Sequence, residues 1–281
     1  MKTPELVHDI AKEAIRACEG LGVPVSVKHR LGVDDHDSWE ELVSFVRLLA
    51  NAGVTHFTVH ARKALLGVLS AEGNRTIPPL RYDWVFALAA AFPELSFELN
   101  GGVSCTREAL RLLAADDGRL GGVMVGRAAY KTPWVLADAD RAVFGRPAAP
   151  SASRAEVLER YLEYAAGTFS ERTRSGRAPP GRGAEELEDA LAAPVSFLFE
   201  DQGPEFREAL LQGLAELRGS GGRAPRGGPP QFLLRRAALA AAAAEAAAAS
   251  TREGAGQGGG AAERARGSAV CRDSESQRLP R

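Results

Sequence analysis

Residues 95–127 read LSFELNGGVSCTREALRLLAADDGRLGGVMVGR, and this stretch decides the fold class. An apolar run at 95–99 leads into Asn100-Gly101-Gly102, a helical pattern occupies 107–115, and a second apolar run at 122–125 leads into Gly126-Arg127. Short apolar strands that alternate with helices build parallel sheets. The stretch therefore predicts two parallel strands joined by a helix, with glycine following each strand.

The same unit recurs towards the N-terminus. Apolar periodicity predicts further strands at 23–28 and 55–60 and further helices at 4–20, 39–51, 82–91 and 133–144. Ser38 and Glu41 have the spacing of a capping box for the helix at 39–51, and Thr106 is the expected cap of the helix at 107–115. Residues 61–80 are expected to form a long loop.

A doubly wound sheet and a TIM barrel both fit this alternation. The barrel is favoured because polar and glycine residues follow all four strands, where barrel enzymes build their sites. A barrel needs eight strand–helix units and only four are present. The sequence thus predicts an α/β fold, the C-terminal half of a TIM (β/α)8 barrel, over residues 1–147. The candidates for the inner faces of its strands are Val25, Val27, Phe57, Val59, Phe97 and Val123.

The strand pattern stops after residue 150. Helical patterns at 154–171, 184–199 and 205–218 predict a small all-helical domain over 151–218. Residues 219–281 are low-complexity Gly, Ala, Arg and Pro with few large apolar side chains, and predict a mostly disordered tail with room for a helix at 231–249.

Composition excludes several classes of protein. The formal net charge of −1 shows no polyanion-binding signature over the whole chain, although residues 219–281 hold ten arginines against five acidic residues. No apolar run approaches the roughly 20 residues that span a bilayer, so no membrane partner is expected. The three cysteines lie far apart without CxxC spacing, so neither a disulfide framework nor a metal site is expected. The compartment, cytoplasmic or organellar, stays open.

The strand ends carry the residues with chemistry. Gly101 and Gly102 allow a close backbone approach and can turn their amides towards an anion, and Gly126 with Arg127 follows the next strand. Two such turns after successive strands predict a phosphate site, whereas a single one is typical of an ordinary turn. Lys28 and His60 also end strands. Taken alone, Lys28 is better explained as a solvated strand-end lysine and His60 as a packed histidine. Together with the phosphate turns they form a coherent site.

Five stretches make a specific resemblance. They are PVSVKHRLG at 24–32, HARKA at 60–64, NRTIPPL at 74–80, NGGV at 100–103 and GVMVGRAAY at 122–130. Together they resemble the tRNA-dihydrouridine synthases, and HARKA and NRTIPPL are distinctive of the A-type branch. The resemblance is strong over residues 4–145, weaker around 191–199, and does not reach the tail.

The resemblance implies a flavin barrel followed by a helical tRNA-binding domain. In the family NADPH reduces FMN, the flavin passes hydride to C6 of a D-loop uridine, and a cysteine protonates C5. The implied partners are therefore FMN, NADPH and tRNA. The implied FMN contacts are Lys28, His60, Asn100, Gly101, Gly102, Gly126 and Arg127. The residues implied at the RNA are Arg62, Lys63, Asn74 and Arg75.

The chain also departs from the family. The family's Asn-x-Gly-Cys-Pro motif carries the proton-donating cysteine, and these 281 residues do not contain it. Neither Cys18 nor Cys105 has those neighbours, so no catalytic residue is assigned. The expectation is a truncated and inactive copy of the enzyme, in which half-barrels could associate with one another.

Two other functions stay open. One is a non-catalytic fragment that binds RNA through its helical domain and its arginine-rich tail. The other is a flavin barrel acting on an unrelated small substrate. The loop at 61–80 disfavours the second alternative, because it matches the A-type pattern and is basic for a simple connector.

Overall fold

The computed structural model describes residues 1–146, 154–175, 190–191, 193–195 and 197–199. These residues fall into two compact units, Met1–Gly126 and the part from Arg127 onward. The predicted domain boundary near 147–151, half of the predicted helix at 184–199, the predicted helix at 205–218 and the tail at 219–281 lie outside the described residues.

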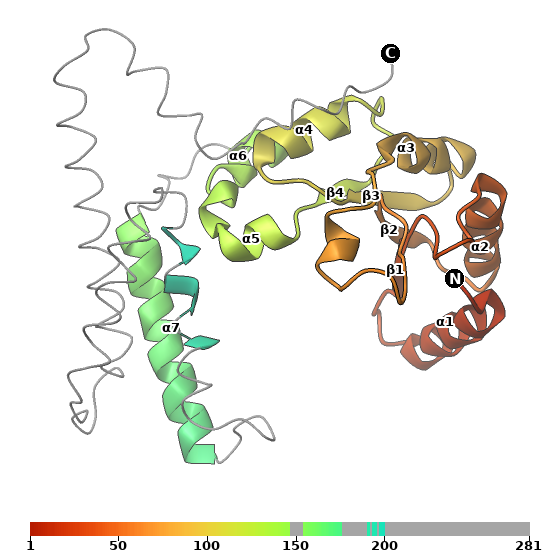
Figure 1. The fold of residues 1–281 in the computed structure, drawn as a ribbon. Helices are drawn as coiled ribbons and strands as arrows, with labels where there is room; N and C mark the ends of the chain where they lie inside the picture. The colour runs from red at the N-terminus through yellow and green to blue at the C-terminus, as the bar shows by residue number, and fades with distance from the viewer. Residues whose placement is uncertain (147–153, 176–189, 192, 196, 200–281) are drawn as a thin grey trace, which may run out of the picture. The chain divides into compact units, whose positions relative to one another are not determined.

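The first unit is built on one sheet of four parallel strands in the order β1-β2-β3-β4 (Figure 1). The strands are β1 (Ser26–Arg30), β2 (His56–His60), β3 (Ser96–Asn100) and β4 (Gly122–Met124). The predicted α/β fold with a parallel sheet is confirmed. The first strand begins three residues later than predicted, after Pro24, whose ring removes a donor from the ladder.

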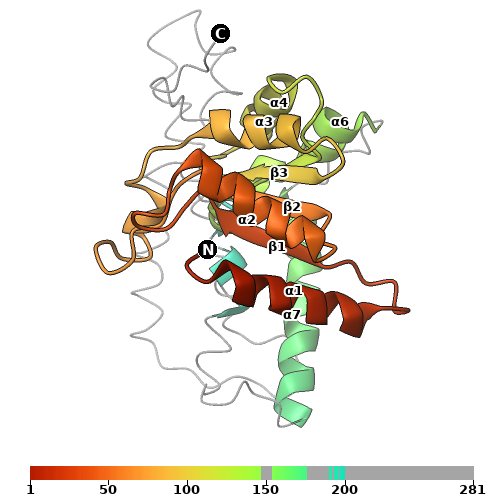
Figure 2. The same cartoon turned by 90° about the vertical axis from the view of Figure 1, so that its right-hand side faces the viewer.

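Four helices accompany the sheet: α1 (Pro4–Cys18), α2 (Trp39–Asn51), α3 (Tyr82–Ala91) and α4 (Thr106–Ala114). Figures 1 and 2 show α1, α2 and α3 on the same side of the strands. One core joins α2, α3 and α4 to a single face of β2 and β3. Its fully buried side chains include Val46, Leu49, Leu88, Leu112 and Phe97. Every helix that connects two strands thus packs on one face of the sheet.

The opposite face of the sheet is polar, which corrects an expectation. A barrel interior is usually filled by bulky apolar side chains, so Phe57, Val59 and Phe97 were expected there. All three are instead buried against the helices. Because strand side chains alternate between faces, the residues between them point the other way. Those residues are Lys28, Arg30, Thr58, His60, Glu98 and Asn100.

One helix cap is confirmed and one is wrong. The Ser38 hydroxyl accepts a hydrogen bond from the Glu41 amide and the Glu41 carboxylate accepts one from the Ser38 amide, which is the predicted capping box. Thr106 does not cap α4 but is its first residue. The Glu108 carboxylate instead accepts hydrogen bonds from the amide and hydroxyl of Ser104, at 2.8 and 3.0 Å.

The second unit is helical where it is described. It contains α5 (Arg127–Lys131), the 3₁₀ helix η2 (Pro133–Leu136), α6 (Ala139–Phe144) and α7 (Arg154–Ser175). The single helix predicted at 133–144 is therefore two shorter ones. Arg154 holds this unit together, because its guanidinium lies 4.5 Å from the centre of the Trp134 ring and donates to the Leu198 carbonyl.

Candidate functional site

The ends of the four strands form one row. The register pairs Arg30 with His60, His60 with Asn100, and Asn100 with Met124. Lys28 lies two residues before Arg30 and therefore on the same face of the sheet. Three residues that the sequence placed in one site, Lys28, His60 and Asn100, are brought together on the polar face.

Asn100 links three strands at this row. Its Oδ1 accepts a hydrogen bond from the Lys28 ammonium at 3.1 Å, and its Nδ2 donates to the Met124 carbonyl at 2.9 Å. Gly126 lies close by, since a Cβ built on it would stand 3.8 Å from Asn100 Nδ2. Burial, with a smaller repulsion from Arg30, lowers the pKa of Lys28. A cation is thus held over the polar face with part of its hydration removed.

Gly101 and Gly102 have a packing reason to be glycine. Their φ angles of +119° and +75° lie in the region that favours glycine. A Cβ on Gly101 would stand 2.7 Å from the His60 ring, and one on Gly102 would stand 2.9 Å from the Tyr82 hydroxyl. That hydroxyl donates to the Gly101 carbonyl at 2.7 Å. Burial, with a smaller effect of the Glu108 carboxylate, raises the pKa of Tyr82 to about 12.

The turn also offers donors. Within the described residues, no hydrogen bond uses the backbone amides of Gly101 or Gly102. Two consecutive residues with positive φ and unused amides have the chemistry of an anion site. The remaining predicted phosphate contact, Arg127, is exposed and begins the second unit, and so is described with that unit.

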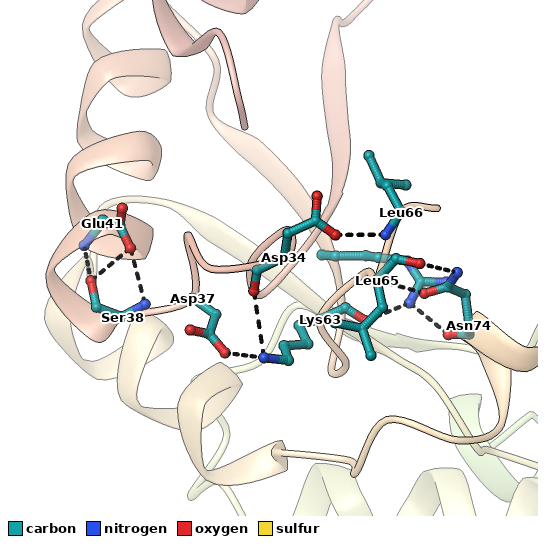
Figure 3. A network of polar contacts seen from close by, with 9 residues as sticks. Asp34, Asp37, Ser38, Glu41, Lys63, Leu65, Leu66 and Asn74 are labelled. Atoms are coloured by element: carbon teal, nitrogen blue, oxygen red, sulfur yellow. Dashed lines mark hydrogen bonds and ion pairs between the residues drawn. The ribbon is translucent and has the colours of Figure 1, made fainter. Parts of the chain in front are cut away.

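The loop between β2 and α3 is organised around Asn74, whose side chain is buried (Figure 3). Its Oδ1 accepts from the Leu65 amide at 2.7 Å. Its Nδ2 donates to the carbonyls of Leu65 and Leu69, both at 3.0 Å, and of Ser70 at 3.3 Å. The amide of Asn74 is therefore used within the loop. Asn74 is itself the middle residue of a short 3₁₀ helix, η1 (Gly73–Arg75).

The basic residues of the loop are tied to the strand ends. The Arg30 guanidinium donates to the carbonyls of Lys63 and Asn74, at 2.9 and 2.7 Å. Arg75 lies near enough to lower the pKa of Arg30, although burial is the larger cause. Arg62 donates to the Pro78 carbonyl. Three cationic side chains of the loop, Arg62, Lys63 and Arg75, thus lie with Arg30 of β1 beside the row of strand ends.

An acidic turn after β1 anchors the same loop. Lys63 forms an ion pair with Asp37 at 2.6 Å, and the Leu66 amide donates to Asp34 at 2.6 Å (Figure 3). Asp34 has a φ of +53° and pairs with Lys2 at 2.5 Å. The two loops that follow β1 and β2 therefore form one connected structure.

Sequence reasoning missed the roles of Arg30 and Tyr82. Arg30 stood in the quoted stretch 24–32, and its place at a strand end was a usable signal. Tyr82 offered no signal, because a tyrosine at the start of a helix gives no hint of a bond to a distant turn. In the part of the chain that the structure describes, no group of three potential metal ligands gathers.

The model of the dihydrouridine synthase family, "Dihydrouridine synthase (Dus)", matches residues 1–178. The chain belongs to the dihydrouridine synthase family. A "tRNA-dihydrouridine(20/20a) synthase" of Synechocystis is 46% identical over 176 residues, which is 63% of this chain and 49% of the relative. Proteins of the same name from Pseudomonas syringae and Pseudomonas putida are 46% and 40% identical over 166 and 203 residues. These matches cover 59% and 69% of this chain and 47% and 58% of the relatives.

This member of the dihydrouridine synthase family spans about half the length of the curated relatives it matches. The expected resemblance is confirmed at the level of the family. Among the helices in the described ranges, none has the length and apolar character to cross a membrane.

Proposed function

We propose that this chain supplies part of an FMN-dependent tRNA-dihydrouridine synthase, which reduces uridine in tRNA to 5,6-dihydrouridine with NADPH as reductant. The observation that carries the proposal is the polar row of strand ends in a chain of this family. The sequential strand order with all connecting helices on one face is the arrangement of a TIM barrel, and supports a barrel segment over a doubly wound sheet.

The residues present fit a flavin phosphate and a flavin ring. The amides of Gly101 and Gly102, which make no hydrogen bond among the described residues, suit the phosphate, and Gly126 lies beside Asn100 at the same row. Arg127, which belongs to the second unit, stays a prediction from the family resemblance. Lys28, His60 and Asn100 lie on the polar face, where a ring would be held. When bound, FMN supplies the two-electron reduction of the uracil C5–C6 bond.

Lys28 has the most direct role at the ring. An ammonium with reduced hydration interacts strongly with nearby negative charge. Asn100 holds the ammonium in place through its Oδ1 and is itself fixed by its bond to Met124. We infer that Asn100 is a positioning residue for Lys28 as well as a contact to the cofactor.

The RNA site is proposed at the loop between β2 and α3. Arg62, Lys63 and Arg75 supply cations beside the strand ends, which suits phosphate and base contacts. Asn74 is assigned differently from the sequence expectation. Because its amide already makes four hydrogen bonds inside the loop, it positions the three cations rather than touching RNA.

The proposed activity needs a proton donor that these 281 residues do not supply. No Asn-x-Gly-Cys-Pro motif is present, so the purified chain is proposed to be inactive by itself. A non-catalytic RNA-binding role is the alternative that this same observation favours.

A segment exchange tests the proposed function. The 176 matching residues of the Synechocystis relative are replaced by those of this chain, and the chimera is expressed in cells that lack dihydrouridine at tRNA positions 20 and 20a. We expect a yellow flavoprotein that restores dihydrouridine, measured by mass spectrometry of tRNA. A folded chimera that binds no FMN, or that binds it and leaves the uridines unchanged, would contradict the proposal. The relative's own intact gene is the control.

A further inference from the structure

Three of the four tyrosines of the chain meet in the second unit, and neither the strand-end row nor the loop after β2 involves them. Tyr130 belongs to α5, whereas Tyr161 and Tyr164 belong to α7. The Tyr130 ring packs on Phe197 with 5.0 Å between ring centres, and the rings of Tyr161 and Tyr164 are 6.1 Å apart. We call these four residues the aromatic patch.

The patch is held from within. The Tyr161 hydroxyl donates to the Leu191 carbonyl at 2.6 Å. Burial raises the pKa of Tyr161, with smaller contributions from the phenols of Tyr164 and Tyr130, which places all three phenols near one another. Tyr161 and Phe197 are partly buried and form the base of the patch.

The outer rings are exposed. Tyr130 and Tyr164 each expose 64% of their surface, which is high for a tyrosine whose ring is packed against another aromatic residue. Each ring is fixed on one side by its aromatic neighbour and open on the other. Little conformational entropy would therefore be lost if a flat group stacked on it.

Cations flank both exposed rings. Arg127 lies three residues before Tyr130 on α5, and Arg160 lies four residues before Tyr164 on α7, so each cation shares a helix face with its ring. Lys131 follows Tyr130 directly. All three basic side chains are exposed. The patch thus combines aromatic faces with positive charge at their edges.

We propose that the aromatic patch is a stacking platform for unpaired bases of RNA, with Tyr130 and Tyr164 as the stacking faces and Lys131 and Arg160 as phosphate contacts. Aromatic rings beside cations are how proteins hold single-stranded nucleic acid with little regard to sequence. A membrane or an apolar protein partner would be matched by aliphatic side chains instead of charges at the edges of both rings. The proposal rests on the proposed function, since that function requires an RNA partner.

The test measures RNA binding by the 281-residue chain. The probes are a fluorescent 12-nucleotide single-stranded RNA of mixed sequence and an unmodified tRNA transcript, titrated by fluorescence anisotropy at several salt concentrations. Removing one stacking face costs roughly 5- to 150-fold in affinity. We expect Tyr130→Ala and Tyr164→Ala each to weaken binding within this range, and Tyr130→Phe and Tyr164→Phe to retain it.

Salt dependence separates stacking from charge. Tyr164→Ala should leave the slope of log affinity against log salt unchanged, because no phosphate contact is removed. Arg160→Gln or Lys131→Gln should make the slope shallower by about 0.7, the value for one phosphate contact to a single strand. Phe144→Ala is the matched control, since Phe144 is 68% exposed in the same unit but already has Arg146 over its ring.

Three outcomes would overturn the proposal. One is unchanged affinity in both alanine variants, another is an equal loss in Phe144→Ala, and the third is no RNA binding by the native chain. If an alanine variant loses its helical circular dichroism, Tyr130→Leu and Tyr164→Leu keep the apolar packing without a stacking face and decide the matter. Failure here leaves the chimera experiment unaffected, because that experiment reads out dihydrouridine.

Discussion

Lys28 is the residue whose proposed role depends most on charge. Lys28→Met in the chimera should lower the flavin reduction potential by on the order of 30 mV, which is about 1.4 kcal/mol for a two-electron couple, because the reduced flavin loses a neighbouring cation. Lys28→Arg keeps the charge and should restore most of the potential. Potentiometric titration of the purified chimera measures both.

Lys12→Met is the control for Lys28, since Lys12 is an exposed lysine on α1, away from the strand ends. An unchanged midpoint in Lys28→Met would exclude the proposed role, even if FMN were still bound through the glycine turn.

His29 is a buried histidine whose protonation opposes folding. It lies on the helix-facing side of β1, with its ring 5.4 Å from the Phe45 ring and 5.9 Å from the Phe57 ring, centre to centre. Its Nδ1 is 2.7 Å from the Arg30 carbonyl, and its Nε2 has no hydrogen-bond partner within the described residues. Burial is the main reason that its pKa falls to about 4.

The sign of the pH dependence follows from that shift. Between pH 4 and an unfolded-state pKa of about 6.5 the unfolded chain binds the proton and the folded chain does not, so stability falls as the pH falls through this window. The contribution reaches at most about 1.4 kcal/mol per pH unit. Urea unfolding at pH 7, 6 and 5 should show this loss in the native chain and a smaller one in His29→Leu. His56→Gln, at an exposed position, should behave as the native chain does.

Residue types at strand ends could be predicted from the sequence, but their partners could not. Lys28, His60 and Asn100 were grouped because parallel strands end at one edge, and the register places them on one face at the strand ends. Asn74 was placed at the RNA because the family resemblance implies it there. Only the path of the backbone decides whether an amide turns outward or satisfies four groups of its own loop.

At the scale of the element, the loop between β2 and α3 depends on Asn74. Asn74→Ala removes one acceptor and the donors to three carbonyls. The carbonyls of Leu65 and Ser70 keep backbone hydrogen bonds, so the half-buried Leu65 amide and Leu69 carbonyl lose the bonds described here. Such a loss costs about 1–3 kcal/mol. We expect a lower free energy of unfolding and faster amide exchange over residues 61–80, measured by denaturant titration and hydrogen exchange.

Asn51→Ala provides the comparison for Asn74, because Asn51 is exposed at the end of α2. Equal losses of stability in the two variants would show that Asn74 does not organise the loop.

Helices were predicted more closely than strand faces. The helix Trp39–Asn51 agrees at both ends because Ser38 and Glu41 fix its start and Gly53 follows its end. The faces of the sheet were assigned the wrong way round. The alternation His56-Phe57-Thr58-Val59-His60 marks two faces, but periodicity does not say which of them meets the helices. A polar barrel interior is the less common arrangement, and the usual one misled the prediction.

At the scale of the whole molecule, the sheet has two outer strands, β1 and β4, and neither pairs with a further strand among the described residues. Unpaired edges favour association. The apolar residues of β2 and β3 are covered by helices, so their side chains do not drive association. Association of two copies stays a prediction, and it now rests on the strand edges alone.

The chain by itself is expected to be catalytically inactive. The purified 281-residue chain, supplied with FMN, NADPH and an unmodified tRNA transcript, should form no dihydrouridine, because no residue in it stands in the motif that donates the C5 proton. Association of two copies would not change this, since neither copy contains the motif.

Two other cysteines, Cys18 and Cys105, are poorly placed to donate the C5 proton instead. Cys18 is the last residue of α1, at the end of the helix that leads into the start of β1, whereas the row of proposed site residues is at the strand ends. Cys105 is 7% exposed, directly precedes α4, and is disulfide-bonded in the structure, which the sequence did not predict. The chimera is the positive control, and mass spectrometry of the tRNA is the measurement. If the chain alone forms dihydrouridine, another acid protonates C5. A loss of that turnover in Cys105→Ser, measured under reducing conditions that free the thiol, would identify Cys105 as the donor.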